Sequence, residues 1–513
     1  MPAGLVALLL GLLHAASFST RQGWWIQLLV LALLFALLPA PHPRPAARAA
    51  AIGFMFGFGS FCAGIGWLYI SMHRYGGLAA PLAVAAVVLL SAYLALYGAA
   101  ALALAQRLAP AARAGAAGML ARIGALAACW MAGELARGWV FTGFPWLSLG
   151  YAQVDGPLAP IAAGIGVYGL GGVVVAVAAA LAALLRWRDH GLRPVLVASG
   201  ATCAVVLGLA GIGLAASAGI EATGPAVSVR LLQGNVEQGM KFDPQRALRA
   251  MNDYTDDVLA GNAQLTVLPE TAWVTTWRAT PSAIRERLFA HLAQNGGHVA
   301  IGLPAPASDP AAAAAGMLSN SVVVRGPDGE PTGRYDKRQL VPFGEYVPPA
   351  FGWFVRMMDI PLGEFARGAA QQPPVRVGGQ AFAFNICYED LFPGLLRQQV
   401  RDGASVLVNI SNIAWFGDSH ALGQHLNISR LRAIELGRPM LRATNTGVTA
   451  AIDPSGRVLA ALEPLTRGAL DVELRGTRGR TFYVRFGHWP VIGFAVLLLL
   501  ALAVRRRQGA RKS

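Results

Sequence analysis

Charged residues and cysteines are both scarce in this chain of 513 residues. Only 13% of the residues are charged and 55% are hydrophobic, which argues against a wholly soluble protein and is typical of an integral membrane protein with a water-facing domain. Three of the four cysteines, Cys62, Cys129 and Cys203, lie within long apolar segments, where a thiol usually packs as a small hydrophobic group. The sequence therefore offers no obvious disulfide framework and leaves Cys387 as the one thiol in a polar region.

The excess of basic residues lies mostly outside that polar region. The net charge is +15, yet residues 218–487 carry 26 basic and 24 acidic side chains. No basic stripe with interleaved aromatic residues occurs there, which argues against a nucleic-acid partner. His420 and His425 lie five residues apart with no third ligand in sight, so we expect no metal site.

Eight apolar segments are predicted to cross a membrane, because about 20 apolar residues span a hydrocarbon core of about 30 Å. They are residues 3–18, 23–40, 50–71, 78–106, 118–136, 158–185, 195–217 and 488–504. The first segment has the length of a signal peptide, but it lacks a basic start and a clear small-residue cleavage site, so we predict a span.

The basic residues also predict the orientation of the spans. If both termini are cytoplasmic, thirteen basic residues of the short loops and the C-terminal tail lie inside, and only Arg21, Arg74 and Arg137 lie outside, as the positive-inside rule requires. We therefore predict a seven-span bundle over 1–217, an exported domain over 218–487, a last span over 488–504 and a cytoplasmic basic tail over 505–513.

Strands and helices alternate in the exported domain. Strand patterns occur at 227–235, 265–270, 298–303, 319–325, 381–386 and 405–410, and helical periodicity occurs at 242–259, 283–295 and 424–436. Short hairpins are mixed in, with turns at 327–329 and 453–456. This order predicts a layered α/β domain.

Two chemically useful side chains follow predicted strands. Cys387 ends an alternating apolar run and precedes Tyr388, Glu389 and Asp390, which is how a nucleophile is presented. Glu270 follows another strand, and we expect its apolar neighbours to raise its pKa so that it acts as a general base. The alternative for Glu270 is a helix N-cap or a surface acid.

Lys337 is notable because lysine is rare here. The chain has 39 arginines but only three lysines, so a lysine beside Arg338 suggests a need for a compact ammonium, which suits an oxyanion better than a guanidinium. A solvated loop lysine is the alternative. Glu345, in the same loop, is expected to orient Lys337 or the proton acceptor of the thiol; the alternative is an acid at the rim of the site.

These motifs resemble a known superfamily. Leu-Pro-Glu270, Tyr-Asp-Lys337 and Asn-Ile-Cys387-Tyr-Glu resemble the Glu–Lys–Cys triad of the nitrilase, or carbon–nitrogen hydrolase, superfamily. The longer motifs at 337–348, 386–390, 409–418 and 143–147 resemble its membrane-embedded branch, the apolipoprotein N-acyltransferase family of Gram-negative bacteria, over nearly the whole chain. The resemblance implies a membrane α-helical bundle with a nitrilase-like αββα sandwich domain facing the periplasm from the inner membrane.

The resemblance also implies a reaction. An acyl chain passes from a phospholipid donor to Cys387 as a thioester, and then to the N-terminal amine of a diacylated apolipoprotein acceptor. Glu270 moves the protons, Lys337 and a backbone N–H near Tyr388 stabilise the oxyanion, and Tyr388, Glu389 and Glu345 support the site. No cofactor and no metal are implied.

An apolar path for the acyl chain is expected, because moving a chain of about 16 carbons into water costs on the order of 12 kcal/mol. The candidate residues are Phe144, Pro145, Trp146, Phe242, Phe343, Trp415 and Phe416, and residues 343–365 are predicted to form a gate. Phe242 stands where the family commonly has tryptophan. Aromatic residues beside spans also serve as simple interfacial anchors.

Two other functions remain compatible with parts of this pattern. A membrane-tethered amidase would use the same triad with water as the acceptor. A transporter would use the outer domain only to bind its ligand, but the spans lack buried ionisable residues apart from Glu134 and Arg137, which argues against a conduction path. We expect those two residues to form a local ion pair.

Overall fold

The computed structural model describes residues 2–38, 45–109, 115–237, 243–348, 352 and 364–510. The chain forms two compact units. The helical unit comprises Met1–Gly66, Val84–Gly219 and Thr481–Ser513, and the sheet unit comprises Trp67–Ala83 and Ile220–Arg480. The segment Trp67–Ala83, which lies within the bundle boundaries predicted from the sequence, thus packs with the sheet unit.

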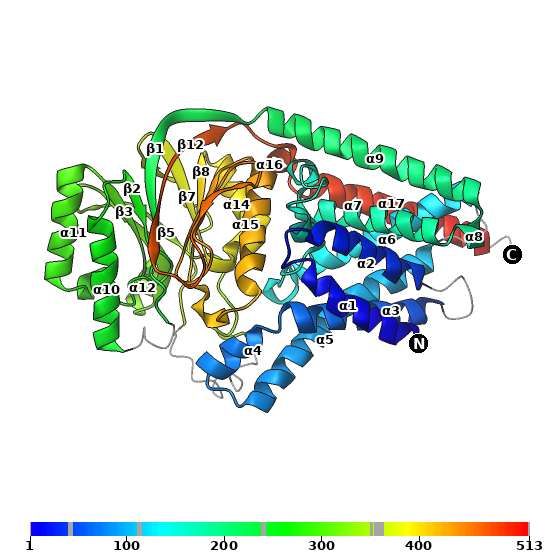
Figure 1. The fold of residues 1–513 in the computed structure, drawn as a ribbon, viewed down its shortest axis with the longest axis horizontal. Coiled ribbons are helices and arrows are strands. Elements are labelled where there is room, and N and C mark those ends of the chain that lie inside the picture. Colours follow the sequence, from blue (N-terminus) through cyan, green and yellow to red (C-terminus); the bar gives the residue numbers. More distant parts are fainter. Residues whose placement is uncertain are drawn as a thin grey trace. The chain divides into compact units, whose positions relative to one another are not determined.

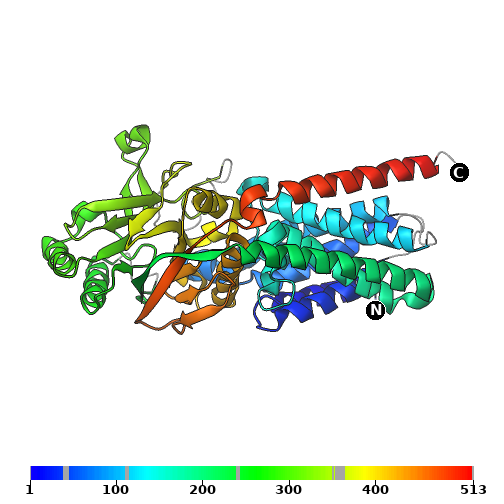
Figure 2. The same ribbon diagram turned by 90° about the horizontal axis from the view of Figure 1, so that it is seen from above.

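Long apolar helices run side by side in the helical unit (Figure 2). Among the residues that the structure describes, six helices are long and apolar enough to cross a membrane: α3 (Pro45–Gly64), α5 (Ala80–Leu108), α6 (Gly115–Arg137), α7 (Ile161–Leu185), α9 (Leu192–Ala218) and α17 (Trp489–Ala510). Two apolar helices are shorter, α1 (Ala3–Ala16) and α2 (Gly23–Ala36), with 14 residues each. A helix of that length rises only about 21 Å, so the prediction of eight full spans is approximate.

The helix predicted over 50–71 differs from the observed one at both ends. It begins at Pro45 and ends at Gly64. The segments that join the unit's long helices include α8 (Trp187–His190), η2 (Val140–Thr142), η3 (Leu149–Gln153) and α16 (Phe482–Phe486).

Glycine allows α1 and α3 to pack closely. A Cβ on Gly11 would lie 2.1 Å from the carbonyl oxygen of Phe56, and a Cβ on Gly59 would lie 2.4 Å from that of Leu8. Helices surrounded by lipid associate mainly through such close van der Waals contact, since there is no water to exclude.

The sheet unit contains two mixed six-stranded sheets. The first has the order β12-β1-β2-β3-β4-β5 and the second the order β11-β10-β9-β8-β7-β6. The pairs β1–β2, β2–β3, β7–β8 and β8–β9 are parallel, and the other neighbours are antiparallel. The strands are β1 (Glu221–Gln233), β2 (Leu265–Val267), β3 (His298–Pro306), β4 (Leu318–Arg325), β5 (Pro331–Asp336), β6 (Val375–Val377), β7 (Gln380–Ile386), β8 (Val406–Ser411), β9 (Met440–Thr444), β10 (Ala450–Ile452), β11 (Val458–Ala461) and β12 (Gly468–Arg478).

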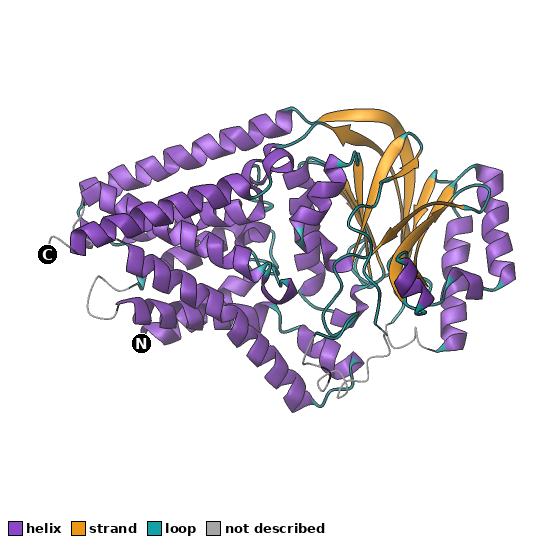
Figure 3. Cartoon of the chain, turned by 180° about the vertical axis from the view of Figure 1, so that it is seen from behind, coloured by secondary structure: helices purple, strands orange, loops and turns teal. Residues whose placement is uncertain are grey.

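Helices cover the outer faces of both sheets (Figures 1 and 3). On the first sheet lie α10 (Pro244–Leu259) and α11 (Ser282–Asn295), and on the second lie α14 (Pro393–Arg401) and α15 (Ala421–Leu436). The predicted αββα sandwich is therefore confirmed. The remaining short helices are α4 (Leu68–Ile70), η1 (Ser71–Tyr75), η5 (Trp277–Ala279), α12 (Pro310–Ala314), η6 (Cys387–Leu391) and η7 (Ile413–Phe416).

The main core lies between the two sheets. Valine and leucine side chains of β1 and β2 pack there against the alternating Phe382, Phe384 and Ile386 of β7. The intervening residues of β7 are buried as well, because α14 covers the opposite face. This rigid core fixes the end of β7, where Cys387 follows.

Truncating the core is expected to destabilise the sheet unit. Phe384→Ala should lower the free energy of unfolding by about 3–5 kcal/mol, since the cavity it leaves cannot collapse fully. Thermal or chaotrope unfolding of the detergent-solubilised protein measures this. Leu459→Ala, at a side chain that is 55% exposed on β11, is the control and should change stability by less than about 0.5 kcal/mol.

Candidate active site

Polar side chains meet where strands of the two sheets end. Glu270 lies just beyond β2, Lys337 directly follows β5, Cys387 directly follows β7 and Asn412 directly follows β8. The carboxyl ends of parallel strands are the usual place for ligands in α/β folds. Gly302 permits the approach of β3, because a Cβ there would lie 2.4 Å from the carbonyl oxygen of Pro269.

A buried lysine lies between two buried carboxylates. Lys337 Nζ donates to Glu270 Oε1 at 3.1 Å and to Glu345 Oε1 at 2.9 Å, and Lys337 itself is only 1% exposed. The backbone N–H of Val341 donates to Glu345 Oε2 at 2.8 Å. Glu345 is thus a buried partner of Lys337 and not an acid at the rim.

Two asparagines complete this cluster, and no sequence motif pointed to the first, Asn320. Asn320 Nδ2, from β4, donates to Glu270 Oε1 at 2.8 Å and to Glu345 Oε1 at 2.7 Å. The backbone N–H of Asn412 donates to Glu270 Oε2 at 2.8 Å. Both oxygens of Glu270 therefore accept hydrogen bonds, which fixes the direction of the carboxylate.

These contacts set the charges of the pair. Burial alone would raise the pKa of Glu270, but the Lys337 ammonium and the donors Asn320 and Asn412 outweigh burial and hold that pKa below its usual value. The expectation that apolar neighbours raise this pKa is therefore wrong in direction. Burial lowers the pKa of Lys337, whereas the Glu270 and Glu345 carboxylates raise it, and the result lies well above its ordinary value. At neutral pH the carboxylate and the ammonium are both charged.

Cys387 occupies a strained position at the start of η6. Its φ is 56°, in the left-handed region that a residue with a Cβ rarely adopts. Burial and the Glu270 carboxylate raise the pKa of its thiol, and the Lys337 ammonium offsets only part of this effect. The resting thiol is therefore neutral, and a nucleophilic sulfur requires a base to take its proton.

Glu389 holds the turn that follows Cys387. Its buried carboxylate accepts from the backbone N–H groups of Ile386, Arg338 and Gln339 at 2.7, 2.7 and 3.0 Å and from the Tyr335 hydroxyl at 2.9 Å. The carboxylate thereby ties the Cys387 turn to the segment that carries Lys337.

Tyr388 is also buried. Its hydroxyl donates to the carbonyl of Leu340 at 3.4 Å, and its ring lies edge-on to Phe392. The hydroxyl and the ring of Tyr388 therefore both contact residues that lie near the Cys387 turn.

Three predicted lipid-path residues of the sheet unit contact the segment Trp67–Ala83. Phe416 packs on Trp67 with ring centroids 4.2 Å apart, and Trp415 lies edge-on to Tyr75 at 5.9 Å. Phe343 packs against an apolar cluster around Leu78 and Ala83, and it adopts a left-handed φ of 65°. These contacts bring together apolar and aromatic side chains from two distant parts of the sequence.

Other predicted lipid-path residues lie elsewhere. Phe144, Pro145 and Trp146 belong to the helical unit, where Trp146 is 3% exposed. Phe242 and residues 349–351 and 353–363, most of the predicted gate, fall outside the described residues.

Glu134 and Arg137 form an ion pair, but they also bind the chain that follows α6. Arg137 Nη1 donates to the carbonyl oxygens of Phe144 at 2.7 Å and Trp146 at 2.5 Å, while Glu134 Oε1 accepts from the backbone N–H of Leu149 at 2.9 Å. Non-helical backbone within a membrane unit needs internal partners. These two charges supply them, so the pair is more than a local contact within one helix.

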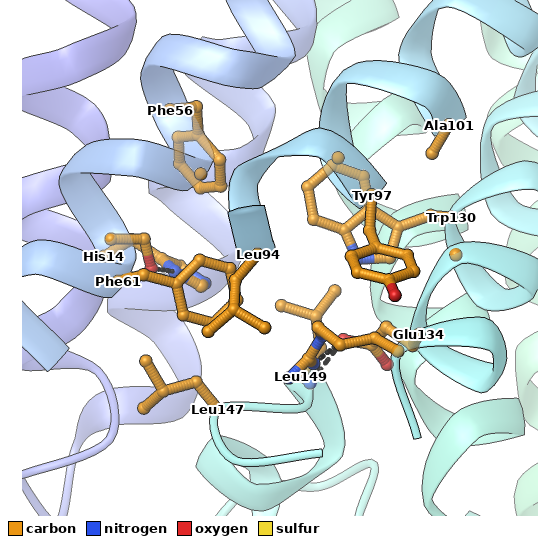
Figure 4. Close-up of a pocket in the computed structure, with 15 residues that line it drawn as sticks. His14, Phe56, Phe61, Leu94, Tyr97, Ala101, Trp130, Glu134, Leu147 and Leu149 are labelled. Carbon is orange, nitrogen blue, oxygen red and sulfur yellow. Dashed lines mark hydrogen bonds and ion pairs between the residues drawn. The ribbon is translucent and has the colours of Figure 1, made fainter. Parts of the chain in front are cut away.

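A small cavity adjoins this pair (Figure 4). Its volume of about 40 Å³ has space for about three water molecules. Tyr97 and Glu134 line it together with apolar side chains such as Phe56 and Leu94. The cavity lies wholly within the helical unit.

A metal centre is not indicated where the structure describes the chain. Within residues 2–38, 45–109, 115–237, 243–348, 352 and 364–510, no group of three or more His, Cys, Asp or Glu side chains is arranged to hold an ion. His425 instead contacts Asp390 Oδ1 at 3.1 Å, and His420 is exposed.

The fold and the site define a carbon–nitrogen hydrolase domain. The family model described as carbon-nitrogen hydrolase matches residues 228–481, and the one described as apolipoprotein N-acyltransferase N-terminal domain matches residues 10–180. Proteins named apolipoprotein N-acyltransferase are similar over nearly the full length: that of Ralstonia nicotianae is 45% identical over 98% of this chain and 94% of its own, and that of Bordetella bronchiseptica is 43% identical over 89% and 88%. The chain belongs to the apolipoprotein N-acyltransferase family.

Solved structures align with half of the chain. An amidase from Nesterenkonia sp. is 22% identical, with a TM-score of 0.37, and covers 52% of this chain and 94% of its own. The C. elegans NitFhit protein is 21% identical, with a TM-score of 0.39, and covers 52% and 63%.

Removing the negative charge of Glu270 and removing the positive charge of Lys337 should shift the pKa of the Cys387 thiol in opposite directions. Glu270→Gln removes a negative charge and should lower the pKa of Cys387, whereas Lys337→Met removes a positive charge and should raise it. The measurement is the rate of Cys387 alkylation by iodoacetamide against pH, followed by peptide mass spectrometry. Shifts in the same direction in both variants would contradict this electrostatic assignment.

Breaking the Glu134–Arg137 pair should destabilise the helical unit. Arg137→Ala leaves a buried carboxylate and two loop carbonyls without their donor, so a loss of about 3–5 kcal/mol is expected. The thermal midpoint in detergent reports it. Arg21→Ala, at an exposed arginine, is the matched control and should melt like the parent protein.

Proposed function

We propose that this protein transfers an acyl chain from a phospholipid to the N-terminal amine of a diacylated apolipoprotein, through a thioester on Cys387. The observation that carries the proposal is the thiol of Cys387, which directly follows β7 and whose pKa is shifted by the charges of Glu270 and Lys337. These two buried side chains are themselves joined by a hydrogen bond. The full-length similarity to proteins named apolipoprotein N-acyltransferase supports the choice of substrates.

The first half-reaction forms the thioester. Glu270 takes the proton of the Cys387 thiol as the sulfur attacks the ester carbonyl of the phospholipid. Lys337 and the backbone N–H of Tyr388 stabilise the tetrahedral oxyanion. The ester C–O bond then breaks, and the departing lysophospholipid oxygen takes the proton from Glu270.

The second half-reaction uses the same groups. The α-amino group of the acceptor's modified cysteine attacks the thioester, and Glu270 accepts its proton. The C–S bond breaks, the thiolate leaves as the amide forms, and Glu270 returns the proton to sulfur. The depressed pKa of Glu270 keeps it ionised and ready before each attack.

The chemistry is expected to occur at a membrane surface. The chain is a membrane-embedded protein with long apolar helices, and delivering an acyl chain through water would cost on the order of 12 kcal/mol. The side chains of Phe343, Trp415 and Phe416, which pack against Trp67–Ala83, offer apolar contact for that chain. We place the sheet unit in the periplasm, both termini in the cytoplasm and the chain in the inner membrane, with no cofactor.

Mass spectrometry tests the reaction class. Wild-type protein incubated with phospholipid should gain one acyl mass on Cys387, and a diacylated lipopeptide should remove that mass and become triacylated. Cys387→Ser should show neither event. A thioester that decays in buffer as fast as it reacts with the lipopeptide would instead identify a hydrolase, and no adduct on the wild type would refute the covalent mechanism.

A further inference from the structure

A second buried charge cluster lies beneath the Cys387 turn. Asp390 Oδ2 accepts from the Ser429 hydroxyl at 2.5 Å and from Arg442 Nη1 at 3.4 Å, and Asp390 Oδ1 contacts His425 Nε2 at 3.1 Å. Arg442 also donates to the Ser429 hydroxyl. All four side chains are at most 1% exposed, and the proposed reaction uses none of them.

The cluster joins three elements to the nucleophile. Asp390 lies in η6, three residues after Cys387; Ser429 and His425 come from α15, and Arg442 comes from β9. In the sheet, Arg442 pairs with Asn409 of β8. Asn409 Nδ2 in turn donates to the carbonyl oxygen of Cys387 at 2.8 Å.

We propose that Asp390, held by Ser429, His425 and Arg442, is a positioning residue that fixes the Cys387–Tyr388 peptide for oxyanion stabilisation. This inference rests on the proposed acyl transfer. Because a peptide is planar and trans, its C=O and N–H groups point in opposite directions. Anchoring the Cys387 carbonyl on Asn409 therefore fixes the direction of the Tyr388 N–H, the proposed oxyanion donor.

The strained backbone of Cys387 explains why the turn needs the contacts of this cluster. The left-handed φ of Cys387 costs of order 1 kcal/mol or more for a residue with a Cβ, so the turn relaxes unless its surroundings hold it. Glu389 restrains it from the side of Lys337, and Asp390 restrains it from the side of α15 and β9. Losing one of these restraints should let the peptide rotate while the hydrophobic core stays folded.

Asp390 is suited to hold several donors at once. Burial would raise the pKa of Asp390, but its interactions with His425 and Arg442 and the hydrogen bond from Ser429 hold that pKa below its usual value. An ionised carboxylate offers more acceptor sites than the amide of asparagine, which presents one oxygen and two donors.

The same helix offers a matched control. Glu435 and Arg432 of α15 form a buried ion pair at 2.6 Å, and both are fully buried. Glu435→Gln perturbs a buried charge pair in this unit but leaves the Asp390 contacts in place.

The test measures the rate of thioester formation for each competent thiol. Detergent-solubilised Asp390→Ala, Asp390→Asn, Ser429→Ala and Glu435→Gln are mixed with p-nitrophenyl acetate, a small ester that needs no lipid site. The burst of p-nitrophenol is divided by the amount of Cys387 that iodoacetamide titrates, and thermal midpoints are recorded in parallel.

We expect the burst rate constant of Asp390→Ala to fall by about 10- to 100-fold, since losing an oxyanion donor outright costs about 100- to 1,000-fold. Asp390→Asn should fall between alanine and the parent, Ser429→Ala should lose about threefold or more, and Glu435→Gln should keep the parent rate per thiol whatever its midpoint. The proposal would be overturned if Asp390→Ala, per titrated thiol, reacted as fast as the parent protein. If Asp390→Ala does not fold, the same result in Ser429→Ala would overturn it. A parent protein that bursts but never transfers acyl groups to a lipopeptide would refute the proposed function alone.

Discussion

The active site depends on one buried ammonium shared by two buried carboxylates. Lys337 contacts both Glu270 and Glu345, and any one of these charges left alone in the interior would be strongly unfavourable. Asn320 bridges the two carboxylates, so the cluster behaves as one unit. Its consequence for Cys387 is a neutral thiol near an ionised carboxylate, since the Glu270 charge raises the pKa of that thiol.

Backbone strain and polar anchors act together around the nucleophile. The β7 strand ends in a core of large apolar side chains, which fixes where the chain leaves the sheet. Immediately afterwards Cys387 takes a left-handed conformation, and the carboxylates of Glu389 and Asp390 bind groups of different elements, the segment after β5 and helix α15. In the helical unit Glu134 and Arg137 likewise hold a non-helical segment in place, because their side chains form hydrogen bonds with its backbone groups.

Sequence patterns predicted the fold better than the electrostatics. The order of strands and helices and the triad motifs led to the αββα sandwich, which the structure confirms. The predicted direction of the Glu270 pKa shift was wrong. Apolar neighbours in the sequence suggested burial, which raises this pKa, but they did not reveal the hydrogen-bond donors on β4 and just after β5 and β8, whose effect outweighs burial. The first two apolar segments read as full spans, yet their helices have only 14 residues, since hydropathy marks a segment and not its helical length.

The sequence by itself determined which residue types are available: one thiol in the polar region, a rare lysine beside an arginine, and long apolar segments with an asymmetric charge distribution. Local patterns suffice for these because strand and helix periodicity and membrane partition act over neighbouring residues. Only the tertiary structure decided that Asn320 bridges two acids, that Asp390 meets Arg442, and that Trp67–Ala83 packs with the sheet unit. Such contacts join residues far apart along the chain, and the burial and charge that set their energies exist only after the chain has folded.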